Sequence, residues 1–97
     1  MKIGYIVIIE EIREQGTGAY ASEYVHSDLK QALAEMHSDI VGMTSDEEGD
    51  FGWLAYVYNT RPEDVVETKK TDRYTTFCDK LTGDTIEIFV HEVKIVD

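Results

Sequence analysis

One segment of this chain has a clear helical period, and that segment limits the folds open to the rest. Ser27 and Asp28 precede it, and Ser can cap an orphan backbone N–H while Asp suits the positive end of a helix dipole. Gly42 is typical of a helix end. Between them, apolar residues recur on one face at helical spacing: Leu29, Ala32, Leu33, Met36, Ile40 and Met43. The sequence predicts one main helix with one buried side.

The remaining apolar segments are expected to be extended. Residues 3–9 are almost continuously apolar, which is typical of a strand covered on both faces, and residues 16–18 form a flexible glycine-rich turn. An apolar start followed by Glu10 and Glu11, without a small-residue cleavage site, indicates a strand rather than a signal peptide. Strands are predicted over residues 3–12, 20–26, 51–59, 73–80 and 85–96.

Two local questions stay open at this level. Residues 60–72 fit either a short helix, because Thr60 and Glu63 have capping-box spacing, or an extended loop. The last hairpin has two competing registers. The preferred register sets Lys80 opposite Thr85, and therefore Phe77 opposite Ile88 and Arg73 opposite Glu92. A slip of one residue would set Asp79 against Glu87, a like-charge pair that weakens the ladder.

These elements predict a single globular α+β domain over residues 1–97, in the order β-β-α-β-β-β. A small, mostly antiparallel sheet of four to five strands would carry one main helix packed on one face. Three of the strands look apolar on both sides, and one helix covers only one sheet face. The second face would be covered by residues 60–72, by a second copy of the chain, or by a different partner.

The composition narrows the class of protein. A single cysteine, Cys78, excludes an internal disulfide framework and suits a reducing cytoplasm, where we expect the protein to be located. Twenty acidic residues oppose nine Lys and Arg, giving a net charge of −11. DNA, RNA and anionic membranes would repel such a surface, whereas basic proteins would be attracted to it.

Motifs that carry chemistry are weak or incomplete. Two His-Ser-Asp triplets begin at His26 and His37, but consecutive side chains point in different directions and do not form a catalytic triad. Cys78 and His91 are expected to lie too far apart along the sheet for a thiolate pair. A calcium loop from Asp46 fails at its twelfth position, Val57, where a bidentate Glu is needed. We predict no enzyme activity, catalytic residue, metal site or cofactor.

The acidic residues are distributed unevenly. Residues 26–50 hold seven acids against Lys30, a net charge of −6. On the helix, Asp28, Glu35 and Asp39 fall within about 40° of one another at 100° per residue, and this stripe continues into residues 46–50. An extended line of negative charge approximates a nucleic-acid backbone. The predicted partner-binding residues are Asp28, Glu35, Asp39, Asp46, Glu47, Glu48 and Asp50, with Tyr20 and Tyr24 as aromatic anchors.

In size and charge, though in no aligned residues, this small acidic α+β chain resembles phage-encoded inhibitors of host defence that mimic nucleic acid, such as anti-CRISPR and anti-restriction proteins. The resemblance implies a non-enzymatic inhibitor that blocks the basic groove of a nucleic-acid-binding protein. It transfers no functional positions. The alternative is a homo-oligomeric structural or accessory protein, a homodimer for example, that assembles through an exposed apolar sheet face and whose acidity serves only solubility.

Overall fold

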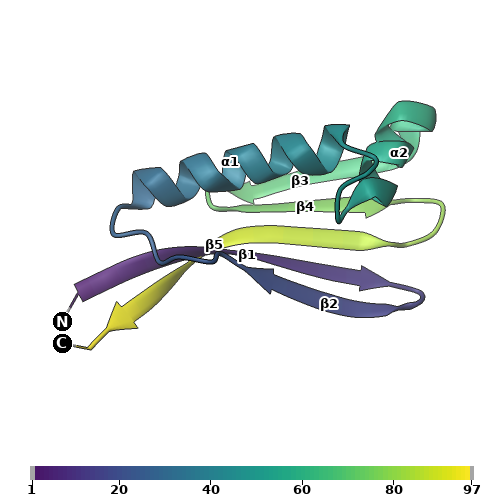
Figure 1. Cartoon of the computed structure of the whole chain (residues 1–97). Helices are drawn as coiled ribbons and strands as arrows, with labels where there is room; N and C mark the ends of the chain where they lie inside the picture. The colour runs from purple at the N-terminus through teal and green to yellow at the C-terminus, as the bar shows by residue number, and fades with distance from the viewer. Residues whose placement is uncertain (1, 97) are drawn as a thin grey trace.

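The computed structural model describes residues 2–96 and shows a five-stranded antiparallel sheet with two α-helices on one face (Figure 1). The strands lie side by side in the order β2-β1-β5-β4-β3. The predicted α+β class is therefore confirmed, with one helix more than expected. The elements are β1 (Lys2–Arg13), β2 (Gly16–Ala21), α1 (Leu29–Ser45), α2 (Gly52–Thr60), the 3₁₀ turn η1 (Pro62–Asp64), β3 (Val65–Thr71), β4 (Tyr74–Asp79) and β5 (Thr85–Ile95).

The core lies between the helices and the central strands. Phe77 of β4 and Ile86 and Ile88 of β5 are fully buried beneath the helices. Helix α1 contributes Met36 and Met43. The predicted apolar side of this helix thus faces the sheet, and hydrophobic burial is what holds the two layers together.

Helix α1 begins and ends later than the sequence indicates. Asp28, not Ser27, is the N-cap, and its carboxylate accepts a hydrogen bond from the Lys30 N–H at 2.9 Å. Gly42 does not end the helix, which continues to Ser45; the Asp46 N–H then donates to the Gly42 carbonyl. A glycine costs a helix interior only about 1 kcal/mol, and the burial of Met43 offsets that cost.

The strand predicted over residues 51–59 is wrong, because this segment forms helix α2. Phe51, Leu54 and Ala55 are buried at helical spacing, while Tyr56 is exposed. A run that is apolar at nearly every position satisfies both periods, so periodicity could not separate a helix from a strand. At the start of α2 only glycine fits, since a Cβ at Gly52 would collide with the Glu47 carbonyl.

Residues 60–72 form the single turn η1, with Pro62 at its first position, and then strand β3. The expected short helix is present only as the 3₁₀ turn η1, and most of the segment expected as a loop is instead strand β3. Strand β3 pairs with β4 at the edge of the sheet, so the suggestion that these residues fold over the second sheet face is also wrong.

The other predicted strands are present with shifted limits. The second strand covers Gly16–Ala21, so the glycines predicted as a turn lie inside it, and His26 only bridges to Tyr5. In the last hairpin Phe77 pairs with Ile86, not Ile88, and Thr75 pairs with Ile88. The preferred register was therefore wrong by two residues. A shift of two keeps every side chain on its predicted face, so the alternation is satisfied equally well.

The second face of the sheet carries no covering element within residues 2–96 (Figure 1). By strand alternation it presents Ile6, Ile8 and Phe89 at its centre, with Tyr74 stacked on Phe89 at a ring separation of 5.2 Å. Glu10 and Glu87 face each other across the same surface. No helix in this part of the chain is both long enough and apolar enough to cross a membrane.

Candidate functional site

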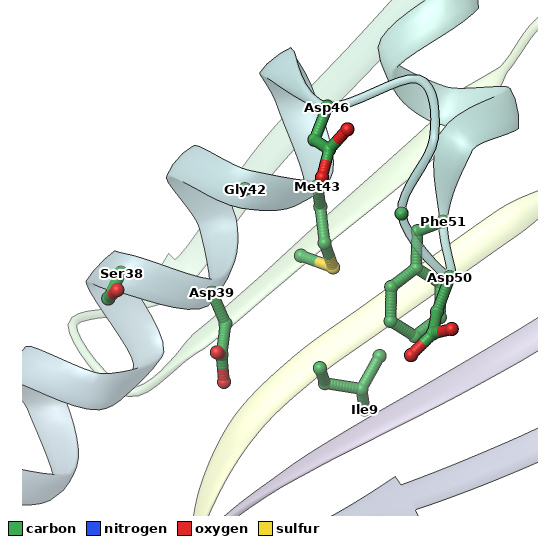
Figure 2. Close-up of a pocket in the computed structure, with 9 residues that line it drawn as sticks. Ile9, Ser38, Asp39, Gly42, Met43, Asp46, Asp50 and Phe51 are labelled. Atoms are coloured by element: carbon green, nitrogen blue, oxygen red, sulfur yellow. The ribbon is translucent and has the colours of Figure 1, made fainter.

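Two adjoining hollows run along one side of α1, between this helix and strands β1 and β2. Both are lined by Ile9 and Asp39, so the two hollows adjoin. The first hollow, about 240 Å³, has an apolar floor of Ile9, Met43 and Phe51 and an acidic rim of Asp39, Asp46 and Asp50 (Figure 2). The second is lined by Val7, Tyr20, Ala21, Ser22 and Glu35. We call the joined hollows the acidic groove.

The acidic groove contains five of the nine predicted binding residues: Tyr20, Glu35, Asp39, Asp46 and Asp50. The helical spacing that placed Glu35 and Asp39 on one side of α1 corresponds to their position in the structure. Asp28 caps the N-terminus of the same helix. Tyr24, 73% exposed, lies between β2 and α1, and neither it nor Glu47 or Glu48 lines the groove.

Glu35 is held in place by two neighbours from the segment before the helix. Its carboxylate accepts a hydrogen bond from the Ser22 hydroxyl at 2.5 Å and lies 3.0 Å from His26 Nε2. Ser22 in turn accepts from the Val7 N–H at 2.7 Å, which ties the cluster to β1. Glu35 is therefore a pre-oriented carboxylate. The two neighbours have no sequence signal, because the segment 22–26 was expected to be an ordinary strand.

Asp39 lies half-buried where the two hollows meet. Burial is the main factor that raises the pKa of its carboxyl, and the nearby charge of Glu35 raises the pKa further. Desolvation and the like charge of Glu35 both oppose the ionised form of Asp39. Within residues 2–96, no lysine or arginine forms an ion pair with Glu35, Asp39, Asp46 or Asp50.

The loop from Asp46 to Asp50 is ordered by its own side chains. Asp46 accepts a hydrogen bond from the Glu48 N–H at 3.0 Å, and Glu47 accepts from the Asn59 amide of α2 at 2.8 Å. In the part of the chain that the structure describes, no group of three or more His, Cys, Asp or Glu side chains is arranged to hold a metal ion.

Tyr20 combines an exposed surface with a fixed position. Its ring packs edge-on against Phe51 at a centroid distance of 5.1 Å, and 43% of the residue is exposed. Phe51 was missed as part of the site because residues 51–59 were predicted to be a strand. In the structure it links Tyr20 to the acidic rim. Such a partly exposed aromatic residue beside charged groups is typical of protein interfaces.

Comparison with known proteins gives no relative: no family model, no curated protein and no solved structure matches this chain.

Proposed function

We propose that this protein is a non-enzymatic binding protein whose acidic groove and flanking loop dock into the basic groove of a nucleic-acid-binding protein and block access by nucleic acid. The observation that carries the proposal is the gathering of four carboxylates along one side of α1, Glu35, Asp39, Asp46 and Asp50, none of which has a Lys or Arg partner among residues 2–96. We also propose that the protein acts in the cytoplasm and inhibits a host defence system, as anti-CRISPR and anti-restriction proteins do.

The length of the acidic side of α1, from Asp28 to Asp46, supports mimicry of nucleic-acid charge. From Asp28 to Asp46 helix α1 rises about 27 Å at 1.5 Å per residue. About eight phosphates of one DNA strand cover the same length, at 3.4 Å per phosphate. A partner that tracks phosphates with Lys and Arg would meet carboxylates over a similar distance. Tyr20 would add an apolar contact beside them.

The mechanism is steric and electrostatic. Negative charge on the inhibitor accelerates its encounter with a basic channel, and the docked protein then occupies the space that nucleic acid needs. Association should be fast and should slow as salt is added. No bond is made or broken in this scheme, so it requires no nucleophile, metal or cofactor.

The test uses charge reversal in two places with equal net charge. Glu47→Lys/Glu48→Lys changes the loop at the end of the acidic side, whereas Glu63→Lys/Asp72→Lys changes exposed residues at η1 and the β3–β4 turn. Association with a captured nucleic-acid-binding partner is measured by surface plasmon resonance, with duplex DNA as competitor. We expect the loop variant to lower the association rate about tenfold and the control variant to lower it far less.

Equal loss in both variants would show that only net charge matters and would contradict a localised acidic surface. Unchanged binding in the loop variant would contradict nucleic-acid mimicry. Binding that duplex DNA does not displace would contradict it as well.

A second function, a homo-oligomeric accessory protein, is favoured by the uncovered sheet face with Ile6, Ile8 and Phe89 at its centre. Apolar packing of that face would give an oligomer that survives 1 M salt, where the Debye length is about 3 Å. Light scattering at low and high salt tests this function separately from the acidic groove.

A further inference from the structure

Strand β5 is longer than the strand beside it. Its pairing with β4 covers Thr85 to Phe89, and the Val90 N–H then donates to the Arg73 carbonyl at 2.9 Å. Residues 91–95 continue as a strand that pairs with β1 alone. In Figure 1 this C-terminal part of β5 runs out beside the start of β1, beyond β4. Within residues 2–96, one side of this part of β5 is therefore an unpaired sheet edge.

The hydrogen-bonding groups on this edge can be assigned from the backbone. Along a strand, successive residues direct their N–H and C=O groups to alternate sides. Because the Val90 N–H points toward the β4 side, those of Glu92 and Lys94 point the same way, where no strand within residues 2–96 pairs with them. An unpaired row of this kind is a template for another strand.

We propose that a second copy of this chain pairs along this edge, with the two β5 strands antiparallel about a two-fold axis between their Val93 residues. Glu92 of each copy then lies opposite Lys94 of the other, so the dimer contains two cross-strand ion pairs. The inference does not depend on the acidic groove or on the uncovered sheet face. It joins the two sheets edge to edge into one sheet of ten strands.

Two constraints select this register. Outward-facing residues must pair with outward-facing residues, which leaves axes at residue 92, 93 or 94. An axis at 92 sets Glu92 against its own copy and runs Lys94, Ile95 and Val96 alongside residues 88–90, whose edge β4 and Arg73 already occupy. An axis at 94 sets Lys94 against Lys94. The axis at 93 pairs residues 91–95 of one copy with the same residues of the other, so that only Val96 reaches the Val90 edge, and it alone matches opposite charges.

The side chains at the join suit a symmetric contact. Val93 meets its own copy at the axis, and His91 lies opposite Ile95, which is 36% exposed in the single chain. These odd-numbered residues are on the uncovered face of the sheet. A charged residue such as Lys94 would protect the edge from pairing if the approaching strand offered no carboxylate, but a second copy offers Glu92.

The test is a charge exchange measured by sedimentation velocity on the intact chain. Glu92→Lys gives Lys opposite Lys, and Lys94→Glu gives Glu opposite Glu, so each variant alone should raise the dimer dissociation constant about tenfold or more. Mixing the two variants should restore a heterodimer. The double variant Glu92→Lys/Lys94→Glu should restore the homodimer.

The double variant is also the control for folding and for the contact between Arg73 and Glu92, which is 3.6 Å in the single chain and is lost in both Glu92→Lys variants. Circular dichroism checks that each variant is folded. The proposal is overturned if the unaltered chain remains a monomer at millimolar concentration. It is also overturned if the single variants dimerise as well as the unaltered chain, which would place the contact elsewhere, for example on the uncovered sheet face.

Discussion

Carboxylates occur in two contrasting settings in this molecule. At the corner of η1 and β4, Asp79 is 1% exposed and Arg61 donates to both of its oxygens, at 3.2 and 2.9 Å. Leu81 and Thr82 donate two further hydrogen bonds. In the acidic groove, four carboxylates share one side of α1 and no Lys or Arg pairs with them among residues 2–96. The charge of Asp79 is thus neutralised by Arg61, whereas the acidic groove gathers several negative charges together.

The difference shows which acids serve the fold. The hydrogen bonds from Arg61 are the main factor that lowers the pKa of Asp79, against the opposing effect of its burial. Desolvation raises the pKa of Asp39, with Glu35 adding to it, and no counter-charge compensates. Asp79 therefore stabilises the folded chain in its ionised form, whereas ionised Asp39 destabilises it. A carboxylate kept at a cost to stability is a candidate for function.

Removing Asp79, the carboxylate that Arg61 neutralises, should have the largest effect on stability. Asp79→Ala deletes an acceptor of four hydrogen bonds and leaves Arg61 with Asp64 alone, at 2.7 Å. We expect the free energy of unfolding to fall by about 3 kcal/mol, measured by urea denaturation. Asp50→Ala is the matched control, and as an exposed change it should stay within about 0.5 kcal/mol. Equal losses of stability in Asp79→Ala and Asp50→Ala would contradict the difference between the two kinds of carboxylate.

The elements that the sequence predicts well are those with one unambiguous period. Helix α1 has a single apolar side, and its burial follows that side. Residues 51–59 are apolar at nearly every position, so the choice between helix and strand depended on packing into the same core cluster as Met43 and Phe77, which sequence spacing does not show. Strand β3 is an exposed edge strand with three charged residues, and a strand that buries almost nothing leaves no alternation to detect.

The same limit applies to the hairpin register and to the acidic groove. Like charge excluded a slip of one residue, but a shift of two preserves the faces and has no signature in the sequence. Helical spacing placed Glu35 and Asp39 together. Long-range folding determined that Phe51 and Tyr20 would lie beside them and that Ser22 and His26 would hold Glu35. The binding role of these residues stays a prediction.

As the pH falls, the contributions of Asp79 and Asp39 to the free energy of unfolding should change in opposite directions. Asp79 has a lowered pKa, so its stabilisation is complete above the unfolded value of about 3.9 and is lost as the pH falls through the folded value. Asp39 has a raised pKa, so its cost disappears as the pH falls toward about 4. The urea midpoint should therefore rise slightly as the pH falls from neutrality toward the unfolded value of about 3.9, and it should fall below that value.

Two variants should show which carboxylate causes each part of the pH dependence of the urea midpoint. Asp79→Ala should flatten the fall at low pH, and Asp39→Asn should remove the rise. A rise that persists in Asp39→Asn would belong to another carboxylate and would contradict this account of the acidic groove.

The smallest expected effect is the most specific to the acidic groove. Asp39→Asn keeps the shape of the side chain and removes the charge that lies half-buried beside Glu35. At neutral pH we expect a gain of about 0.3 kcal/mol in the free energy of unfolding, because the neutral amide avoids the desolvation cost of a half-buried charge and the like charge of Glu35 four residues away. Binding to the proposed basic partner should weaken in the same variant. A variant that is more stable yet binds less well would show that the charge at position 39 is retained for recognition, since no ion pair or side-chain hydrogen bond among residues 2–96 uses it.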